Sequence, residues 1–426
     1  MSSDTPSLTV GVPKESFPGE HRVALVPSAA KSLSRAGFSM VVQAGAGLAA
    51  GFRDSDYTAA GVTIVPSHEE VYRQADVLAV VRAGGANPGH SSEDLALLRA
   101  GQTVVGHLDP LTHPEEIRKL AEKQVSAFSL ELLPRITRAQ SMDVLSSMAT
   151  VAGYKAVLMA ADSLPRMFPM MMTAAGTIKP ARVFVMGAGV AGLQAIATAK
   201  RLGAVVFAYD VRPVVKEQVE SVGGKFVELN LETGEAETKG GYAKEMSEEF
   251  LRRQREELTK VIADCDVVIT TAAIPGKKAP ILLTKEMVSA MAPGSVVIDL
   301  AAERGGNCEL TREGETVDFN EVSIVGPVNL PASIPYHASE MYSKNISTFL
   351  VHLKKTGFHD LDLDDEIIRD TLVARGGEVV NDRIRPLLGL DPLATPPEEP
   401  PAAAPDAKPL TDLNAEFDAK EDRPSS

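Results

Sequence analysis

The stretch Gly187-Ala188-Gly189-Val190-Ala191-Gly192 decides the fold of this chain. It is a G-x-G-x-x-G pattern, preceded by the apolar residues 182–186 and followed by a helical pattern over residues 190–202. In such a turn the first glycine permits a tight reversal, the second lets the backbone approach a pyrophosphate, and the third allows close packing of helix on strand. The amides at the helix N-terminus then face the negative charge. The pattern therefore predicts a dinucleotide-binding βαβ unit.

An acidic residue follows the second strand of that unit. Asp210 comes 18 residues after Gly192. A carboxylate there accepts hydrogen bonds from the adenosine ribose 2′-hydroxyl and repels a 2′-phosphate, so it favours NAD(H). Arg212 keeps NADP(H) open, because a nearby arginine is a common way to hold a 2′-phosphate. An isolated glycine motif is often just a turn, but here strand, helix, second strand and acid are all in place.

Short apolar runs alternate with helical patterns on both sides of this unit. The runs are rich in Val, Ile and Leu without strict alternation, which is typical of strands buried on both faces of a parallel sheet. One series occupies residues 8–130 and a second begins at residue 181, with a polar segment at 135–148 and a helix predicted over 149–168 between them. The predicted fold class is α/β, with two doubly wound, Rossmann-like domains and parallel sheets.

After the second series the chain is predicted to return to the first domain and to end in a hairpin over residues 367–380. The first domain is then discontinuous, comprising residues 1–145 and 330–388, while residues 146–329 form the NAD(H)-binding domain. Residues 391–426 are rich in Pro and Ala and hold nine acidic and three basic residues. This composition predicts a disordered acidic tail.

Composition excludes several other classes. The 426 residues are 44% hydrophobic and carry a net charge of −14, which argues against binding to nucleic acid or anionic lipid. Cys265 and Cys308 stand apart from any metal-binding pattern, so we expect a reducing compartment and no metal site. Residues 1–7 lack the apolar core of a signal peptide. The apolar residues 183–199 fall short of the ~20 needed to span a bilayer, so no membrane insertion is expected.

The polar segment between the two domains is a candidate for the nicotinamide site. Polar side chains at a cleft between α/β domains suit the amide and ribose of a nicotinamide, although an interdomain hinge fits equally well. The segment supplies Arg135, Arg138, Gln140, Asp143 and Ser146. The long charged stretch 230–246 is either a lid, with Tyr242 closing over an adenosine, or an insertion.

Further polar residues follow predicted strand ends. His107, Asp109 and Arg22 could bind a substrate, although a histidine in such a place is more often structural. Glu303 lies at the ligand-binding edge of the second sheet, where a capping role is equally plausible. The methionine-rich residues 168–173 predict packing in the core or in an interface.

Longer matching stretches carry a family resemblance. The chain resembles the soluble NAD(H)-binding component, domain I of the alpha subunit, of proton-translocating NAD(P) transhydrogenase over about residues 8–355, with a weaker match to about 388. The matching stretches are Pro13-Lys-Glu15, Arg22-Val-Ala-Leu25, Pro134-Arg-Ile-Thr-Arg-Ala-Gln-Ser-Met-Asp143, Phe168-Pro-Met-Met-Met-Thr-Ala-Ala-Gly176, Val190-Ala-Gly-Leu-Gln-Ala-Ile-Ala-Thr-Ala-Lys-Arg-Leu-Gly-Ala204 and Gly240-Gly-Tyr-Ala-Lys-Glu-Met246.

This resemblance implies a homodimer that positions NADH for direct hydride transfer to NADP+ held by another subunit. No side chain then acts as acid or base, and catalysis consists of placing two rings. The implied partners are a separate, membrane-embedded section of the alpha subunit and an NADP(H)-binding beta subunit, which couple the reaction to proton flow. The implied location is the cytoplasmic face of the inner membrane, with the chain held there peripherally by its partners.

The resemblance also assigns site residues. The nicotinamide end would be positioned by Arg135, Gln140, Asp143 and Ser146, with Gln140 nearest the partner nucleotide. The remaining cofactor-binding positions are Ile136, Thr137, Ser141, Met142, Gly187, Ala188, Gly189, Val190, Gly192, Asp210, Val211, Arg212, Gly241, Tyr242, Gln254 and Ala273.

Two alternatives remain open. Alanine dehydrogenases are similar and use a substrate-binding lysine after the strand at residues 77–81, a histidine where His107 stands and an aspartate where Glu303 stands. Here Arg82 follows that strand and no lysine is present, which favours transhydrogenase. The other alternative is a non-catalytic NAD(H)-binding subunit that docks a membrane partner.

Overall fold

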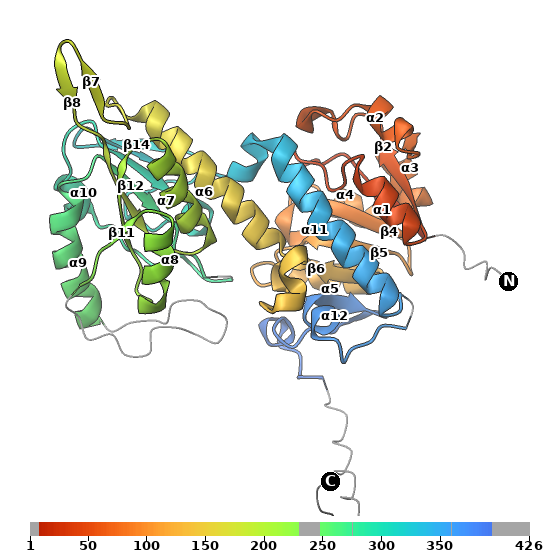
Figure 1. Ribbon diagram of the computed structural model, residues 1–426. Helices are drawn as coiled ribbons and strands as arrows, with labels where there is room; N and C mark the ends of the chain where they lie inside the picture. Colours follow the sequence, from red (N-terminus) through yellow and green to blue (C-terminus); the bar gives the residue numbers. More distant parts are fainter. Residues whose placement is uncertain (1–7, 230–247, 275, 359, 394–426) are drawn as a thin grey trace, which may run out of the picture.

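The computed structural model describes residues 8–229, 248–274, 276–358 and 360–393. Two sheets stand side by side, each covered by helices, with α6 (Val144–Ser163) and α11 (Pro335–Lys355) between them (Figure 1). The α/β fold class with two doubly wound, Rossmann-like halves is confirmed. The predicted acidic tail lies outside the described residues from 394 onward.

The first sheet has eight strands in the order β17-β16-β6-β5-β4-β1-β2-β3. Its strands are β1 (Leu8–Val12), β2 (Phe38–Gln43), β3 (Thr63–Val65), β4 (Val77–Arg82), β5 (Thr103–His107), β6 (Ser126–Ser129), β16 (Leu372–Arg375) and β17 (Glu378–Val379). Its helices are α1 (Ala29–Arg35), α2 (Asp54–Ala59), α3 (His68–Gln74), α4 (Ser91–Leu97), α5 (Pro114–Glu122), α11 and α12 (Glu366–Thr371). Strands β1 to β6 pair in parallel, whereas β16 is antiparallel to β6. The C-terminal segment therefore completes the sheet begun by the N-terminal segment.

The second sheet has seven strands in the order β11-β10-β9-β12-β13-β15-β14. Its strands are β9 (Arg182–Met186), β10 (Val205–Tyr209), β11 (Lys225–Phe226), β12 (Val267–Thr270), β13 (Val296–Asp299), β14 (Thr316–Phe319) and β15 (Val322–Val325). Its helices are α7 (Val190–Arg201), α8 (Lys216–Ser221), α9 (Glu248–Ile262) and α10 (Lys285–Ser289). The order reverses between β9 and β12, and ligands of such sheets bind outside the carboxyl ends of the strands at that point.

Helix α6 links the two halves, and it begins five residues before the predicted start at 149. It starts early because the Asp143 side chain accepts a hydrogen bond from the Ser146 amide and caps it. It ends at Ser163 because Pro165 follows closely. Its first half packs in the core of the first sheet and its second half in the core of the second. Among the described residues it is the one helix long and apolar enough to cross a membrane by length and composition.

The methionine-rich segment forms a short antiparallel hairpin, β7 (Met171–Thr173) with β8 (Gly176–Ile178). The hairpin projects from the second half (Figure 1). Met170 is 60% and Met172 80% exposed, so the prediction that this segment packs in the core is wrong. The hairpin is too short to fold its apolar side chains back onto either sheet, which leaves them facing outward.

The predicted C-terminal hairpin is only partly correct. Residues 366–371 form α12, because Asp365 caps this turn by accepting a hydrogen bond from the Ile367 amide. The hairpin itself is β16 with β17, and it turns at Gly376 and Gly377 as predicted. Both glycines have positive φ, 60° and 90°, which other residues rarely adopt.

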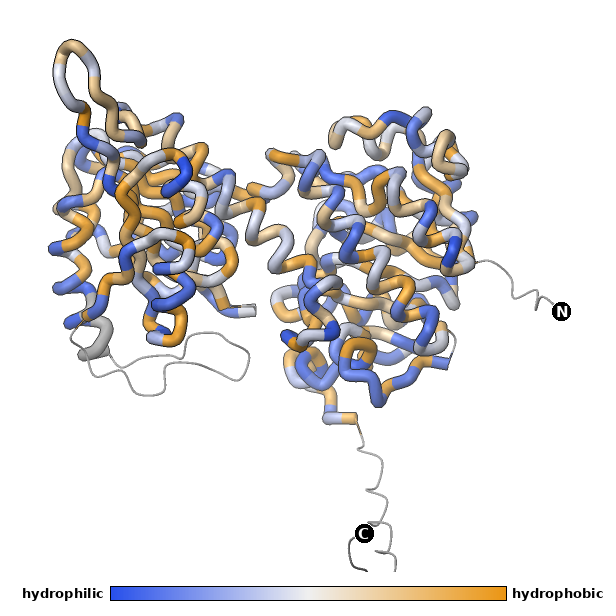
Figure 2. Tube along the Cα trace, viewed as in Figure 1, coloured by the Kyte–Doolittle hydropathy of each residue, from blue (hydrophilic) through white to orange (hydrophobic). Residues whose placement is uncertain are grey.

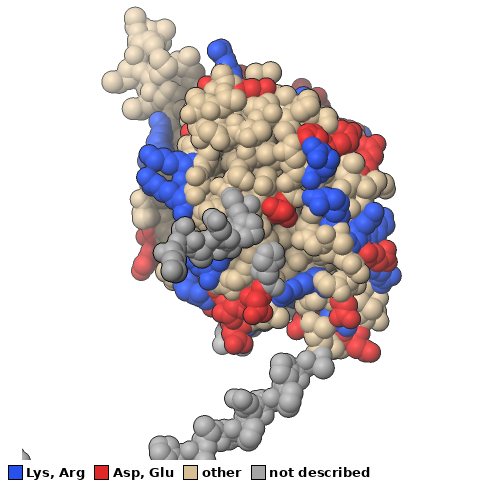
Figure 3. Space-filling view, turned by 90° about the vertical axis from the view of Figure 1, so that its right-hand side faces the viewer, with Lys and Arg blue, Asp and Glu red and all other residues tan. Residues whose placement is uncertain are grey.

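Apolar residues follow the strands in the interior of both halves (Figure 2). On the face that carries the first sheet, basic and acidic side chains are interspersed (Figure 3). The described part of that face therefore presents no broad field of one sign.

Candidate dinucleotide-binding site

The glycine turn lies between β9 and α7. Gly187 has φ +97°, and a methyl at Gly192 would lie 1.9 Å from the Gly187 carbonyl oxygen. No heavy atom lies within 4 Å of the position that a methyl at Gly189 would take. The first and third glycines are therefore required by the protein itself, whereas the second faces open space. That division is what a backbone approached by a pyrophosphate needs.

Asp210 ties the glycine turn to the next strand. Its carboxylate accepts a hydrogen bond of 2.7 Å from the Ala188 amide. The Arg212 guanidinium donates to both of its oxygens at 2.9 Å. This pairing balances the charge of Arg212, which weakens the case for an arginine dedicated to a 2′-phosphate. Val211 packs partly buried against the second core, and Val190 is exposed at the start of α7.

The far wall of the crevice is organised by Asp299, which sequence reasoning did not single out. This fully buried carboxylate accepts hydrogen bonds from Thr270, Thr311 and three backbone amides of residues 301–308. Asn307 in turn bonds both backbone groups of Ala272. The neighbouring Ala273 is exposed in the loop after β12. A buried acid that ends a strand shortly before a pair of adjacent glycines could have signalled this role.

The predicted nicotinamide loop is a 3₁₀ turn, Thr137–Met142, that leads into α6. Met142 is buried in the first core and anchors the turn, and the carbonyl of Ser141 accepts a hydrogen bond from Asn345. Arg135, Thr137 and Gln140 are exposed, and Ile136 is half-buried. Asp143 and Ser146 hydrogen-bond to each other at the helix cap. Arg138 pairs with Asp365 and Glu366 instead of facing the second half.

Helix α6 connects this loop to the glycine turn. A methyl at Gly153 would lie 2.1 Å from the carbonyl oxygen of Ala191, so the two helices touch backbone to backbone. The start of α6 carries the loop, and its middle rests on the first turn of α7. The two groups of predicted site residues are thereby joined by one continuous helix.

Three predicted site residues cannot be placed. Gly241 and Tyr242 lie outside the described residues. Gln254 belongs to α9, but its side chain is not among those described. The lid prediction for residues 230–246 likewise falls on a segment the structure does not describe.

A buried ion network occupies the first half beside the cleft. Arg22 donates to both oxygens of Glu20, at 2.8 and 2.6 Å, and to Asn329 at 3.1 Å. Arg82 donates to the same Asn329 oxygen and lies 3.5 Å from Glu20. Sequence reasoning found Arg22 but missed Glu20 and Asn329, because Asn329 lies 307 residues away from Arg22 in the chain.

A second buried group lies next to this network. Burial raises the pKa of Glu15 to about 8, although its carboxylate accepts hydrogen bonds from the Val81 and Arg82 amides. His107 stacks on Tyr342, with ring centroids 5.4 Å apart, and its Nδ1 lies 3.1 Å from the Val81 carbonyl. Burial and the positive charges of Arg22 and Arg82 lower the pKa of His107 to about 3. His107 is thus a neutral, packed ring, which favours the structural reading.

This shift predicts a pH dependence of stability. The folded pKa of His107 is below the ordinary value of 6.5, so its contribution is fully present above pH 6.5 and is lost as the pH falls toward 3. We expect the free energy of unfolding to fall across this window by up to about 5 kcal/mol from this group alone. His107→Gln should flatten that portion of the curve in urea unfolding at several pH values, whereas the exposed His337→Gln should not. Parallel curves for both variants would contradict the assignment.

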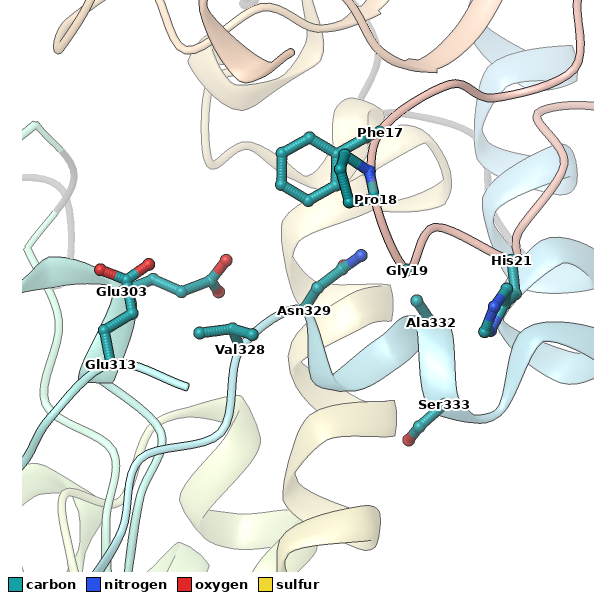
Figure 4. Close-up of a pocket in the computed structure, with 10 residues that line it drawn as sticks. All are labelled: Phe17, Pro18, Gly19, His21, Glu303, Glu313, Val328, Asn329, Ala332 and Ser333. Carbon is teal, nitrogen blue, oxygen red and sulfur yellow. The ribbon is translucent and has the colours of Figure 1, made fainter. Parts of the chain in front are cut away.

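Figure 4 shows a cavity of about 310 Å³ where the two halves meet. Phe17 and His21 lie on the side of the first half, and Glu303 and Glu313 face them from the second. Asn329 lies between the two sides, where the chain crosses back. Glu303 is 3.6 Å from Arg82, so it pairs across the cleft and does not cap a helix.

Both cysteines are buried and unpaired. Burial raises the pKa of the Cys265 thiol to about 12 and that of Cys308 to about 11. Such thiols are inert packing groups.

Comparisons with known proteins agree with this geometry. The chain matches the families "Alanine dehydrogenase/PNT, N-terminal domain" over residues 11–152 and "Alanine dehydrogenase/PNT, C-terminal domain" over residues 156–382. It is 49% identical to the first section of the divided NAD(P) transhydrogenase alpha subunit of Rhodospirillum rubrum, over 88% of this chain and 98% of that protein. A crystal structure of transhydrogenase from Sinorhizobium meliloti matches with a TM-score of 0.77 at 45% identity, over 87% of this chain and 100% of that one. An alanine dehydrogenase of Mycolicibacterium smegmatis is 26% identical over 88% of this chain and 96% of that protein.

A doubly wound sheet with this turn at its switch point places the chain in the class of nicotinamide-dinucleotide-binding α/β proteins. Within that class, the chain belongs to the alanine dehydrogenase/PNT family, in the branch of the NAD(P) transhydrogenase alpha subunits.

Proposed function

We propose that this chain is the NAD(H)-binding subunit of a proton-translocating NAD(P) transhydrogenase, and that it positions NADH for direct hydride transfer to NADP+ on a partner subunit. The observation that carries the proposal is the connection through α6, which joins the exposed polar loop of residues 135–142 to the glycine turn. Bound NADH would supply the hydride. The protein's own contribution is to hold the two ends of the nucleotide with fixed geometry.

The residues would divide the nucleotide between the two halves. The glycine turn, from Gly187 to Gly192, would hold the pyrophosphate against the N-terminus of α7, whose first turn contains no acidic side chain. Asp210, Val211 and Arg212 would take the adenosine ribose. The remaining proposed contacts are Ala188, Val190 and Ala273 around the turn, Gly241, Tyr242 and Gln254 after β11, and Arg135, Ile136, Thr137, Gln140, Ser141, Met142, Asp143 and Ser146 at the nicotinamide end.

The nicotinamide loop provides the first test. Gln140→Asn should leave the Kd for NADH within about twofold, because Gln140 is exposed and makes no contribution to the glycine turn. It should slow hydride transfer at least about tenfold, because shortening the side chain by one methylene changes the placement of the ring. Stopped-flow transfer to an NADP+-loaded partner subunit and equilibrium NADH titration measure the two effects. Equal losses in binding and rate would count against this role for Gln140.

Asp210 provides a test of nucleotide choice. Asp210→Asn should weaken NADH binding about tenfold, because the charged acceptor for the ribose hydroxyl and the charge partner of Arg212 are both removed. NADPH should be affected less or should bind better, because Arg212 then faces a 2′-phosphate without a competing carboxylate. Fluorescence titrations with both nucleotides give the ratio. An unchanged affinity for NADH would remove Asp210 from the proposed site.

The assembly also belongs to the proposal. A second copy of the chain would cover the exposed methionines of the β7–β8 hairpin, forming a homodimer. The partners would be a separate, membrane-embedded section of the alpha subunit and an NADP(H)-binding beta subunit, which agrees with relatives named as one section of a divided alpha subunit. The chain would then lie on the cytoplasmic face of the inner membrane, attached through these partners.

A further inference from the structure

One turn of the second half reaches across the cleft. The 3₁₀ turn Ala302–Arg304 follows β13 at the ligand-binding edge of the sheet. The Arg304 guanidinium donates hydrogen bonds to Asp109 at 2.8 Å and to Thr112 at 2.7 Å, both in the loop after β5. The adjacent Glu303 pairs with Arg82 at 3.6 Å. Two successive side chains of opposite charge thus form ion pairs of opposite sense with the first half.

The receiving residue, Asp109, is held in place before any pairing. It has φ +47°, a left-handed conformation that a residue other than glycine keeps only where its surroundings enforce it. The enforcing group is Glu131, whose carboxylate accepts hydrogen bonds from the amides of Leu108 and Asp109 at 2.9 and 3.0 Å. Asp109 is 17% exposed and Arg304 37%, so their pair is more sheltered than an ordinary surface ion pair.

Glu131 also stands at the base of the nicotinamide loop. It lies in the 3₁₀ turn Leu130–Leu132, four residues before Arg135. A chain of direct contacts therefore runs from the edge of the nucleotide sheet through Arg304, Asp109 and Glu131 to the start of that loop. Close packing supports the same junction, since a methyl at Gly276 would lie 2.8 Å from the Leu111 side chain.

The Glu303 side of the turn meets the crossover segment. Arg82 shares its charge between Glu303 and the Asn329 side chain, at the residue where the chain returns to the first half. Figure 4 shows Asn329 between Glu303 and the Phe17–His21 loop. The turn thus contacts both the loop after β5 and the network beside the crossover.

We propose that Arg304 and Asp109 are positioning residues whose ion pair clamps the two halves together and so fixes the nicotinamide loop relative to the glycine turn. This inference rests on the proposed function. The adenosine half of the nucleotide would bind within the second half alone, whereas the nicotinamide end needs both halves. Loss of the clamp should therefore spare the binding of ADP-ribose and slow hydride transfer, because small misplacements of a reacting ring cost large factors in rate.

The test compares Arg304→Gln, Asp109→Asn and the double variant with the wild-type full chain. Asparagine tolerates the left-handed backbone at position 109, so the second variant removes charge without new strain. Arg312→Gln is the matched control, because Arg312 pairs with Glu315 on the exposed surface of the same half. Three quantities are measured: hydride transfer from NADH to NADP+ on the partner subunit, the Kd for ADP-ribose, and the radius of gyration from X-ray scattering.

We expect each single variant to transfer hydride about tenfold more slowly, with an ADP-ribose Kd within about twofold of wild type and a larger radius of gyration. The double variant should be no slower than either single variant, because both remove the same interaction. Additive slowing, weakened ADP-ribose binding in parallel with the rate, or wild-type behaviour of both single variants would overturn the proposal. If the wild-type chain itself transfers no hydride, the proposed function fails, and the scattering comparison alone decides whether the clamp exists.

Discussion

Gly192→Ala should raise the Kd for NADH roughly 100-fold, equivalent to about 2.7 kcal/mol. The added methyl would lie 1.9 Å from the Gly187 carbonyl oxygen, and this contact is backbone that cannot rotate away. The turn must then move, which displaces the amides at the start of α7. Overpacking of this kind also destabilises the fold by about 1–3 kcal/mol, so the melting temperature without nucleotide should fall as well.

Gly189→Ala separates the ligand from the fold. Gly189 has φ −75° and ψ −168°, which alanine adopts readily, and no protein atom lies within 4 Å of the added methyl. The melting temperature without nucleotide should therefore remain unchanged. The methyl would project into the space where the pyrophosphate is proposed to lie, so NADH binding should weaken at least about tenfold.

Gly89→Ala, in the first half, serves as the matched control, because that position also has open space around it. It should change neither quantity. Differential scanning fluorimetry and NADH titration suffice for all three variants. If Gly189→Ala binds NADH like the wild type, the turn is only a structural reversal, and the pyrophosphate assignment is wrong.

Glu20→Gln should lower the free energy of unfolding by about 3 kcal/mol. The Glu20 side chain is fully buried and holds Arg22, which is itself 4% exposed, by two hydrogen bonds. Glutamine keeps the shape but leaves the arginine charge without its closest counterion. Guanidinium unfolding at pH 7 measures the loss.

The same variant has a defined pH signature. Burial alone would raise the pKa of Glu20, but the hydrogen bonds and charge of Arg22 lower it to about 2. The stabilisation is therefore present above the ordinary pKa of 4.5 and is lost as the pH falls toward 2. The difference between wild type and variant should shrink in that window. The exposed Glu315→Gln is the control and should cost less than about 0.5 kcal/mol. Equal costs for both variants would show that the buried network contributes little.

The nucleotide-binding half was predictable because its signals are local. Three glycines and an acid stand within 24 residues of one another, and each has a separate steric or electrostatic reason. The structure adds why the pattern works: Gly192 and Gly187 touch, and Asp210 bonds the amide of Ala188. The placement of α6 was less accurate, because its start depends on a single capping residue, Asp143, within a polar segment.

The residues that hold the two halves together were not predictable as a set. Asp109 and Arg304 lie 195 positions apart, and Glu20 and Asn329 lie 309 apart. Their pairing depends on how the two sheets face each other, which no local pattern encodes. The exposed methionines were misjudged for a related reason. An apolar run predicts burial, but a short hairpin that projects beyond the sheet cannot bury it within the same chain.

The most direct test of the central claim follows NADH oxidation by the purified full chain under two conditions. The chain contains no tryptophan, so NADH fluorescence can be followed without interference. One sample receives pyruvate and ammonium, and the other receives an NADP+-loaded NADP(H)-binding subunit of a transhydrogenase. We expect oxidation only in the second sample. Oxidation in the first would identify an amino-acid dehydrogenase, and bound NADH with no turnover in either would identify a non-catalytic nucleotide-binding subunit; each result would contradict the proposed function.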